Sequence, residues 1–147
     1  MPLTLNVVTA ERTVLQRDDV LRLIVPTTEG QITVLPSHAA LMSSLGYGEL
    51  LAVVPGGETI EMTVFSGFIQ VVHDHVTVLA DAAERAEDIN EDRADAARAR
   101  AQEHLAGDLP PDLDLMQVRL ALSRALIRLR VRRRARNVSG VRSMSER

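Results

Sequence analysis

The chain has 147 residues, of which 46% are hydrophobic and 25% are charged, and this length suits one ordinary globular domain or a small domain with an appendage. It contains no cysteine, which excludes disulfides and cysteine-based metal or redox sites, and no apolar run approaches the roughly 18 residues of a membrane-spanning helix. The net charge of −3 is divided unevenly, with −5 on residues 1–80, −7 on residues 81–114 and +9 on residues 115–147, where 10 arginines face 1 acid. A cationic last third predicts an acidic partner.

Residues 1–80 have the pattern of a β domain. Short β-branched runs alternate with turn signals, and in the run ETIEMTVF the apolar residues Ile60, Met62 and Val64 recur at every second position. Seven strands are predicted, over residues 3–8, 21–25, 32–35, 49–54, 59–65, 68–72 and 76–79. So many short strands in this length favour a sandwich or a flattened barrel.

The pattern changes to helical near Asp81. Asp81 and Glu84 resemble a capping box, and the following segment, rich in Ala, Glu and Arg, contains no Gly or Pro until Gly107. A second helix is predicted from Asp112 or Asp114 to about Arg134, and its short connector implies an antiparallel hairpin. The predicted organisation is a β domain over residues 1–81, a hairpin over 82–136 and a disordered tail over 137–147.

Few residues form a pattern that could carry chemistry. His73 and His75 flank Asp74 and could bind a metal, although a solvated hairpin turn is favoured because no further ligand lies nearby in the sequence. His38 could act as a base, but no nucleophile motif accompanies it. The glycines match neither the P-loop nor the dinucleotide-binding pattern. We therefore predict no catalytic residue and no metal site.

The run RALIRLRVRRRAR, residues 124–136, is the strongest charge signal. It could be a cationic helix end that interacts with the helix dipole, or a surface that binds an acidic protein. A binding module that uses this helix on nucleic acid or an anionic membrane is the alternative. No aromatic platform is interleaved with the arginines, which weakens the nucleic-acid interpretation.

Three segments in order carry a family resemblance. They are VLRLIVPTTEGQITVLPSHAALMSSLGYGEL, FSGFIQVVHDHVTVLADAAERAEDIN and DLDLMQVRLALSRALIRL. Together they resemble the epsilon subunit of bacterial F-type ATP synthases, and the resemblance covers about residues 3–131. It implies an α+β fold, with a β-sandwich of about ten strands followed by an antiparallel two-helix hairpin.

The resemblance also implies a role without catalysis. The chain would belong to the central stalk, against the gamma subunit, the c-subunit ring and the alpha/beta hexamer, and would help to couple proton translocation to ATP synthesis. It would lie on the cytoplasmic face of the cell membrane as a peripheral part of the complex, without nucleic acid. Its hairpin would inhibit ATP hydrolysis by docking on an acidic segment of the beta subunits. The residues implied in that docking are Arg124, Arg128, Arg130, Arg132, Arg133 and Arg134.

Some bacterial members of this family bind regulatory ATP through a motif of the form I/L-D-x-x-R-A. The corresponding residues here begin with Ile89 and Asn90, so that an amide replaces the carboxylate of the motif. The resemblance thus implies weak ATP binding at most, and no other cofactor. The residues implied in it are Ile89, Asn90, Arg93, Ala94, Arg100, Arg124 and Arg128.

Overall fold

The computed structural model describes residues 1–145. They form two compact units, a β unit of Met1–Arg85 and a helical unit that begins at Ala86. The predicted boundary after residue 81 falls inside the last strand, which continues to Arg85.

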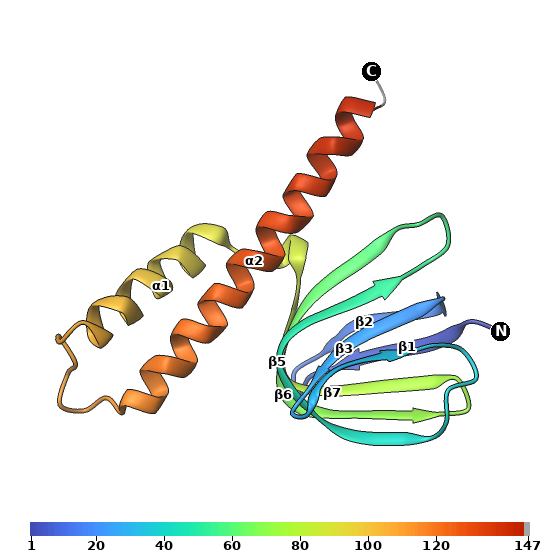
Figure 1. Cartoon of the computed structure of the whole chain (residues 1–147), viewed down its shortest axis with the longest axis horizontal. Coiled ribbons are helices and arrows are strands. Elements are labelled where there is room, and N and C mark those ends of the chain that lie inside the picture. The colour runs from blue at the N-terminus through green and yellow to red at the C-terminus, as the bar shows by residue number, and fades with distance from the viewer. Residues whose placement is uncertain (146–147) are drawn as a thin grey trace. The chain divides into compact units, whose positions relative to one another are not determined.

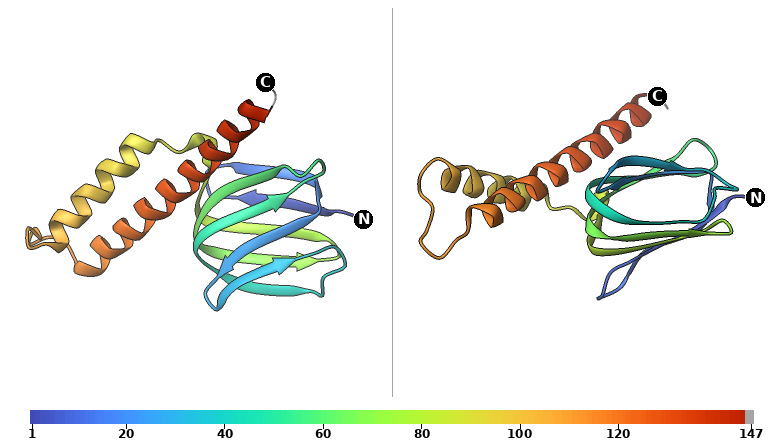
Figure 2. Two further views of the ribbon diagram at one scale, coloured as in Figure 1. Left: turned by 45° about the horizontal axis from the view of Figure 1, so that its top comes forward. Right: turned by 60° about the horizontal axis from the view of Figure 1, so that its bottom comes forward.

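The β unit contains seven strands in one hydrogen-bonded sheet. They are β1 (Leu3–Val8), β2 (Thr13–Val20), β3 (Arg22–Thr27), β4 (Gly30–Val34), β5 (Leu41–Val53), β6 (Thr59–Val72) and β7 (His75–Arg85). Their order across the sheet is β2-β1-β7-β6-β5-β3-β4, in which β1 and β7 are parallel and every other described pair is antiparallel. The sheet folds over on itself into two layers (Figure 2), so the predicted sandwich is confirmed.

The core between the layers is aliphatic because each strand alternates inward and outward residues. In β1, Leu3, Leu5 and Val7 are fully buried, whereas Thr4 and Asn6 are partly exposed. Further fully buried side chains from other strands complete the core, among them Val20, Leu23, Val25, Leu50, Met62, Val64 and Ile69. The core therefore needs no large aromatic residue.

In three neighbouring strands, the residues that face the core switch between odd- and even-numbered positions at the same level of the sheet. We call this switch a change of parity. The core positions are Leu45 and then Leu50 and Ala52 in β5, Met62 and Val64 and then Ile69 and Val71 in β6, and Val78 and Ala80 and then Ala83 in β7. At this level Ser66 has a φ of 64° and Gly67 a φ of 125°, outside the extended region. Dividing β5, β6 and β7 here gives the ten strands of the family resemblance.

Several strands differ from the sequence-based prediction, among them β5, which begins at Leu41 rather than at residue 49. The edge strand β2 was missed because its centre is polar, with Arg17, Asp18 and Asp19 in a row, as is common for edge strands. The runs at residues 59–65 and 68–72 were predicted as two strands but form the single strand β6, since Ser66 and Gly67 bend the chain without ending its pairing with β5 and β7.

The helical unit consists of a short 3₁₀ turn, η1 (Ala86–Asp88), and two helices, α1 (Glu91–Leu105) and α2 (Leu115–Ser145). Figure 1 shows α1 and α2 as the arms of an antiparallel hairpin, as predicted. The predicted helix start at Asp81, with Glu84 in its capping box, is wrong. Residues 82–85 instead pair with β6, where Ala82 lies opposite Phe65, and this pairing overrides their helix propensity.

Both ends of the hairpin loop have clear sequence causes. Gly107 follows the end of α1 with a φ of 132°, and the Asp108 N–H donates to the carbonyl of Glu103, as in a C-terminal cap. Asp114 precedes α2, and its carboxylate accepts a hydrogen bond from the Met116 N–H at 3.2 Å.

Helix α2 is longer than the sequence pattern indicates. It was predicted to end near Arg134, followed by a disordered tail over 137–147, whereas it continues to Ser145. The last two residues of the predicted tail, 146 and 147, lie outside the described residues. The extension lacks apolar periodicity, but it contains no proline that would stop a helix already formed.

Candidate functional site

The two helices of the hairpin pack through small residues on one side and aliphatic residues on the other. Ala94 and Ala101, two turns apart, are the buried residues of α1. Val118, Ala125 and Leu129 of α2 are buried at the seven- and four-residue spacing of one helical face. Alanine allows close approach of the helices but removes little apolar area from water, so this contact alone stabilises the hairpin only modestly.

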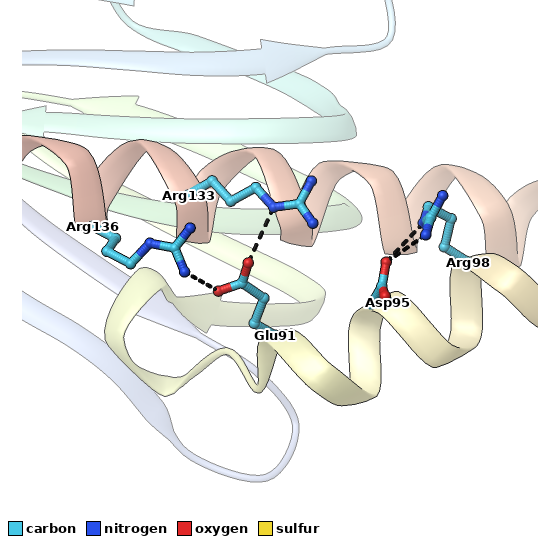
Figure 3. Close-up of polar contacts among 5 residues, drawn as sticks. All are labelled: Glu91, Asp95, Arg98, Arg133 and Arg136. Atoms are coloured by element: carbon cyan, nitrogen blue, oxygen red, sulfur yellow. Dashed lines mark hydrogen bonds and ion pairs between the residues drawn. The ribbon is translucent and has the colours of Figure 1, made fainter.

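A polar cluster joins the helices at the end opposite the loop (Figure 3). The Glu91 carboxylate, in the first turn of α1, accepts a hydrogen bond from Arg133 Nε at 3.1 Å and another from Arg136 Nη1 at 2.9 Å. Arg132, the residue before Arg133, donates through Nη1 to the Ala86 carbonyl of η1 at 3.4 Å. We call Glu91, Arg133 and Arg136 the Glu91 cluster.

The sequence reasoning placed Arg133 in a docking surface and missed both Glu91 and Arg136. Glu91 is 42 residues from Arg133 and 45 from Arg136 along the chain. Periodicity within one helix cannot reveal a contact between two helices. The sequence did contain a weak signal for this contact, namely the acidic first turn of α1 and the arginines late in α2. Antiparallel packing brings the start of α1 close to this part of α2.

The residues implied in ATP binding lie on both helices. Asn90 is the N-cap of α1, where its side-chain oxygen accepts a hydrogen bond from the Arg93 N–H at 3.0 Å. Ile89 and Ala94 are buried, and the arginine side chains of α1 in this set, Arg93 and Arg100, are exposed. Arg124 and Arg128 of α2 are half-buried and one turn apart.

The arginines implied in docking differ in exposure. Arg130, Arg133 and Arg134 are exposed, whereas Arg132 is half-buried, like Arg124 and Arg128. Arg133 keeps half of its side chain exposed, 51%, although it is bonded to Glu91.

Two histidines of the β unit, His38 and His73, lie at turns, and His75 begins β7. His73 and Asp74, with φ values of 47° and 62°, form the tight turn between β6 and β7, as predicted. The Asp74 carboxylate accepts a hydrogen bond from the Ser37 N–H at 2.6 Å, and His38 Nδ1 lies 2.7 Å from the Ala39 carbonyl oxygen. Within residues 1–145, no group of three or more histidine, aspartate and glutamate side chains could hold a metal ion.

The outer face of the sheet carries exposed apolar side chains. Phe68 of β6 and Leu79 of β7 are paired and are 57% and 54% exposed, and Met42 of β5 is 70% exposed. Met42 lies opposite Gln70, two residues from Phe68, and therefore on the same face. We call Met42, Phe68 and Leu79 the outer apolar patch. No described helix is long and apolar enough to cross a membrane.

Comparison with known families decides what this arrangement is. The model of the ATP synthase delta/epsilon chain β-sandwich domain matches residues 2–86, and that of the long α-helix domain matches residues 87–132. The chain belongs to the ATP synthase delta/epsilon chain family. The two family domains meet at the observed junction between β7 and the helical unit.

Individual relatives are similar over nearly their whole length. The ATP synthase epsilon chain of Herpetosiphon aurantiacus is 40% identical over 137 residues, which span 93% of this chain and 98% of that relative. The epsilon chain of Dehalococcoides mccartyi strain CBDB1 is 41% identical over 134 residues, which span 91% and 94% of the two chains. The resemblance to the epsilon family is thereby confirmed.

Solved structures share the fold. A chain of the Euglena gracilis mitochondrial ATP synthase, in a structure of OSCP, F1 and the c-ring, has a TM-score of 0.73 at 22% identity, over 84% of this chain and 77% of that one. A chain of the Tetrahymena thermophila mitochondrial ATP synthase central stalk and c-ring has a TM-score of 0.55 at 15% identity, over 92% and 96%. At these identities the likeness concerns the fold.

Proposed function

We propose that this chain is a non-catalytic epsilon subunit of an ATP synthase central stalk, which couples proton translocation to ATP synthesis and restrains ATP hydrolysis through its hairpin. The observation that carries the proposal is the match of both epsilon-family domains, in order, over residues 2–132. The complex would hold the chain at the cytoplasmic face of the cell membrane as a peripheral subunit.

The β unit supplies the surfaces for the rotor partners. The outer apolar patch exposes three large side chains on one sheet face, and such a group marks an interaction site better than scattered apolar residues do. We assign this patch to the gamma subunit. The turn containing His38, joined to the β6–β7 turn by the Ser37–Asp74 hydrogen bond, is the surface that we assign to the c ring.

The helical unit supplies the regulatory surface. Exposed arginines of α2, including Arg130 and Arg134, can form charge-assisted hydrogen bonds with carboxylates of the beta subunits in the alpha/beta hexamer. Such contacts favour an open hairpin over the closed one, in which α1 and α2 are packed together. Salt weakens these contacts. Regulatory ATP is the one small ligand that we propose for this unit, with weak affinity because Asn90 replaces a carboxylate.

The test is ATP hydrolysis by assembled complexes. Removal of residues 86–147 should raise the hydrolysis rate at low proton-motive force and leave assembly intact, because the β unit carries the rotor contacts. Arg130→Gln with Arg134→Gln should raise the rate partly, whereas Arg12→Gln with Arg22→Gln, two exposed arginines of the β unit, should not. An unchanged rate in the truncated complex would refute the inhibitory role, and loss of the complex would refute the assignment of the rotor contacts.

A further inference from the structure

We infer that Glu91, Arg133 and Arg136 form an internal latch that holds the hairpin closed and competes with an acidic partner for donors of Arg133 and Arg136. The inference deepens the proposed function and rests on it, because it names what Arg133, one of the docking arginines, contacts in the closed hairpin. It also gives a role to two of the arginines that follow Val131, Arg133 and Arg136.

The geometry of the Glu91 cluster supports a specific latch. Each carboxylate oxygen of Glu91 accepts from a different arginine, Oε1 from Arg133 and Oε2 from Arg136. The two arginines are three residues apart and so lie on the same face of α2. The Glu91 side chain is only 25% exposed, so solvent screens these ion pairs less than fully exposed ones.

The position of the Glu91 cluster allows it to keep the two helices together. The loop between α1 and α2 already ties the helices together at one end, whereas the Glu91 cluster lies at the other end, where no covalent link limits separation. The Arg132 bond to the Ala86 carbonyl adds an attachment at the same end. Because Ala94 and Ala101 bury little area, polar contacts at the open end have a large share in keeping the hairpin closed.

The latch and an acidic partner use the same donors. Arg133 Nε and Arg136 Nη1 donate to Glu91, so a partner carboxylate competes with Glu91 for these donors. Glu91 is therefore an internal competitor, and hairpin opening and docking of the arginines are linked equilibria. A ligand that binds only the open form shifts the equilibrium toward the open hairpin, to an extent set by the ligand's affinity for that form.

Hydrogen exchange of the isolated full chain tests the latch. Amides in the middle of α1 exchange through hairpin opening, and Glu91→Gln should speed their exchange about three- to tenfold, the loss expected for two partly exposed ion pairs. Asp92→Asn is the matched control, since it removes one charge from the same helical turn, and thus the same dipole interaction, at an exposed position. Equal exchange rates in the Glu91→Gln and Asp92→Asn variants would overturn the inference.

Two further measurements test its specificity. Arg133→Gln with Arg136→Gln should speed exchange as Glu91→Gln does, and adding Glu91→Gln to that pair should have little further effect, because the interaction is already lost. A deca-glutamate peptide should bind the Glu91→Gln chain more tightly than the Asp92→Asn chain, by about the factor seen in exchange. Additive exchange effects, or equal peptide affinities, would refute the competition.

These measurements are independent of the assembled complex. If Glu91→Gln opens the hairpin and strengthens peptide binding while truncation of residues 86–147 leaves hydrolysis unchanged, the latch stands and the inhibitory role fails. If truncation raises hydrolysis while Glu91→Gln and Asp92→Asn exchange alike, the inhibitory role stands and the latch fails.

Discussion

The side-chain oxygen of Asn90 accepts a hydrogen bond from the backbone N–H of Arg93 at 3.0 Å and so caps the N-terminus of α1. This position corresponds to the carboxylate of the ATP motif in the family resemblance. An amide oxygen caps a helix about as well as a carboxylate does, so helix formation does not require the carboxylate.

The Asn90 cap should contribute measurably to the helical unit. Asn90→Ala leaves an N–H at the start of α1 without its side-chain partner, at a cost of about 1 kcal/mol, whereas Asn90→Asp keeps the bond. Circular dichroism at 222 nm on heating should show earlier loss of helix in Asn90→Ala only. Equal loss of helix in both variants would contradict the cap.

Asn90→Asp should also strengthen ATP binding. A carboxylate forms charge-assisted hydrogen bonds that are roughly twice as strong as those of an amide, so affinity should rise about five- to tenfold. Isothermal titration of the isolated chain with ATP measures this change. Because Asn90→Asp retains the helix cap, stronger ATP binding could not be attributed to a more stable helix. Unchanged ATP binding would count against ATP recognition at Asn90.

Gly67 should tolerate no side chain. A Cβ at this position would collide with the carbonyl oxygen of Leu79 in the neighbouring strand, and its φ of 125° is strained for any other residue. Gly67→Ala should therefore lower the free energy of unfolding by about 2–4 kcal/mol in urea denaturation. Gly57→Ala, where φ is 76° but nothing lies within 4 Å, isolates the backbone strain and should cost about 1–2 kcal/mol.

Ala101 should be sensitive to size, because it is buried in the hairpin. Ala101→Leu should overpack this contact and destabilise the hairpin by about 1–3 kcal/mol, whereas Ala99→Leu, on the exposed side of α1, should have little effect. Hydrogen exchange should become faster in α1 and stay unchanged in β6. Parallel changes in both elements would indicate that the helical and β units unfold together.

The Arg17–Asp19 pair should give a small pH-dependent contribution. Arg17 Nε and Nη2 bond the two carboxylate oxygens of Asp19 at 2.8 and 2.7 Å, and these hydrogen bonds lower the pKa of Asp19. A lowered folded-state pKa stabilises the fold above the ordinary carboxylate value of about 4, and this contribution is lost as the pH falls through the folded-state pKa. Melting temperatures of Asp19→Asn and the unmodified chain should differ slightly at pH 7 and converge near pH 2.

Local signals predicted several boundaries because their causes are local. Asp114 precedes α2 and Gly107 follows α1, as expected, since capping bonds form between residues close in the chain. Residues 82–85 have a helical composition, yet they pair with residues 62–65 of β6, and composition carries no information about that pairing. The candidate ATP and docking sets could be named only through the family resemblance.

Composition and short-range hydrogen bonding were enough to predict the two-part organisation, the two ends of the hairpin loop and the separation of charge. The joint change of parity in β5, β6 and β7, and the bonds of Glu91 to Arg133 and Arg136, became apparent only in the folded chain. Both features depend on which distant segments the fold brings side by side, and contacts across 42 and 45 residues follow from helix packing rather than from any pattern within one helix.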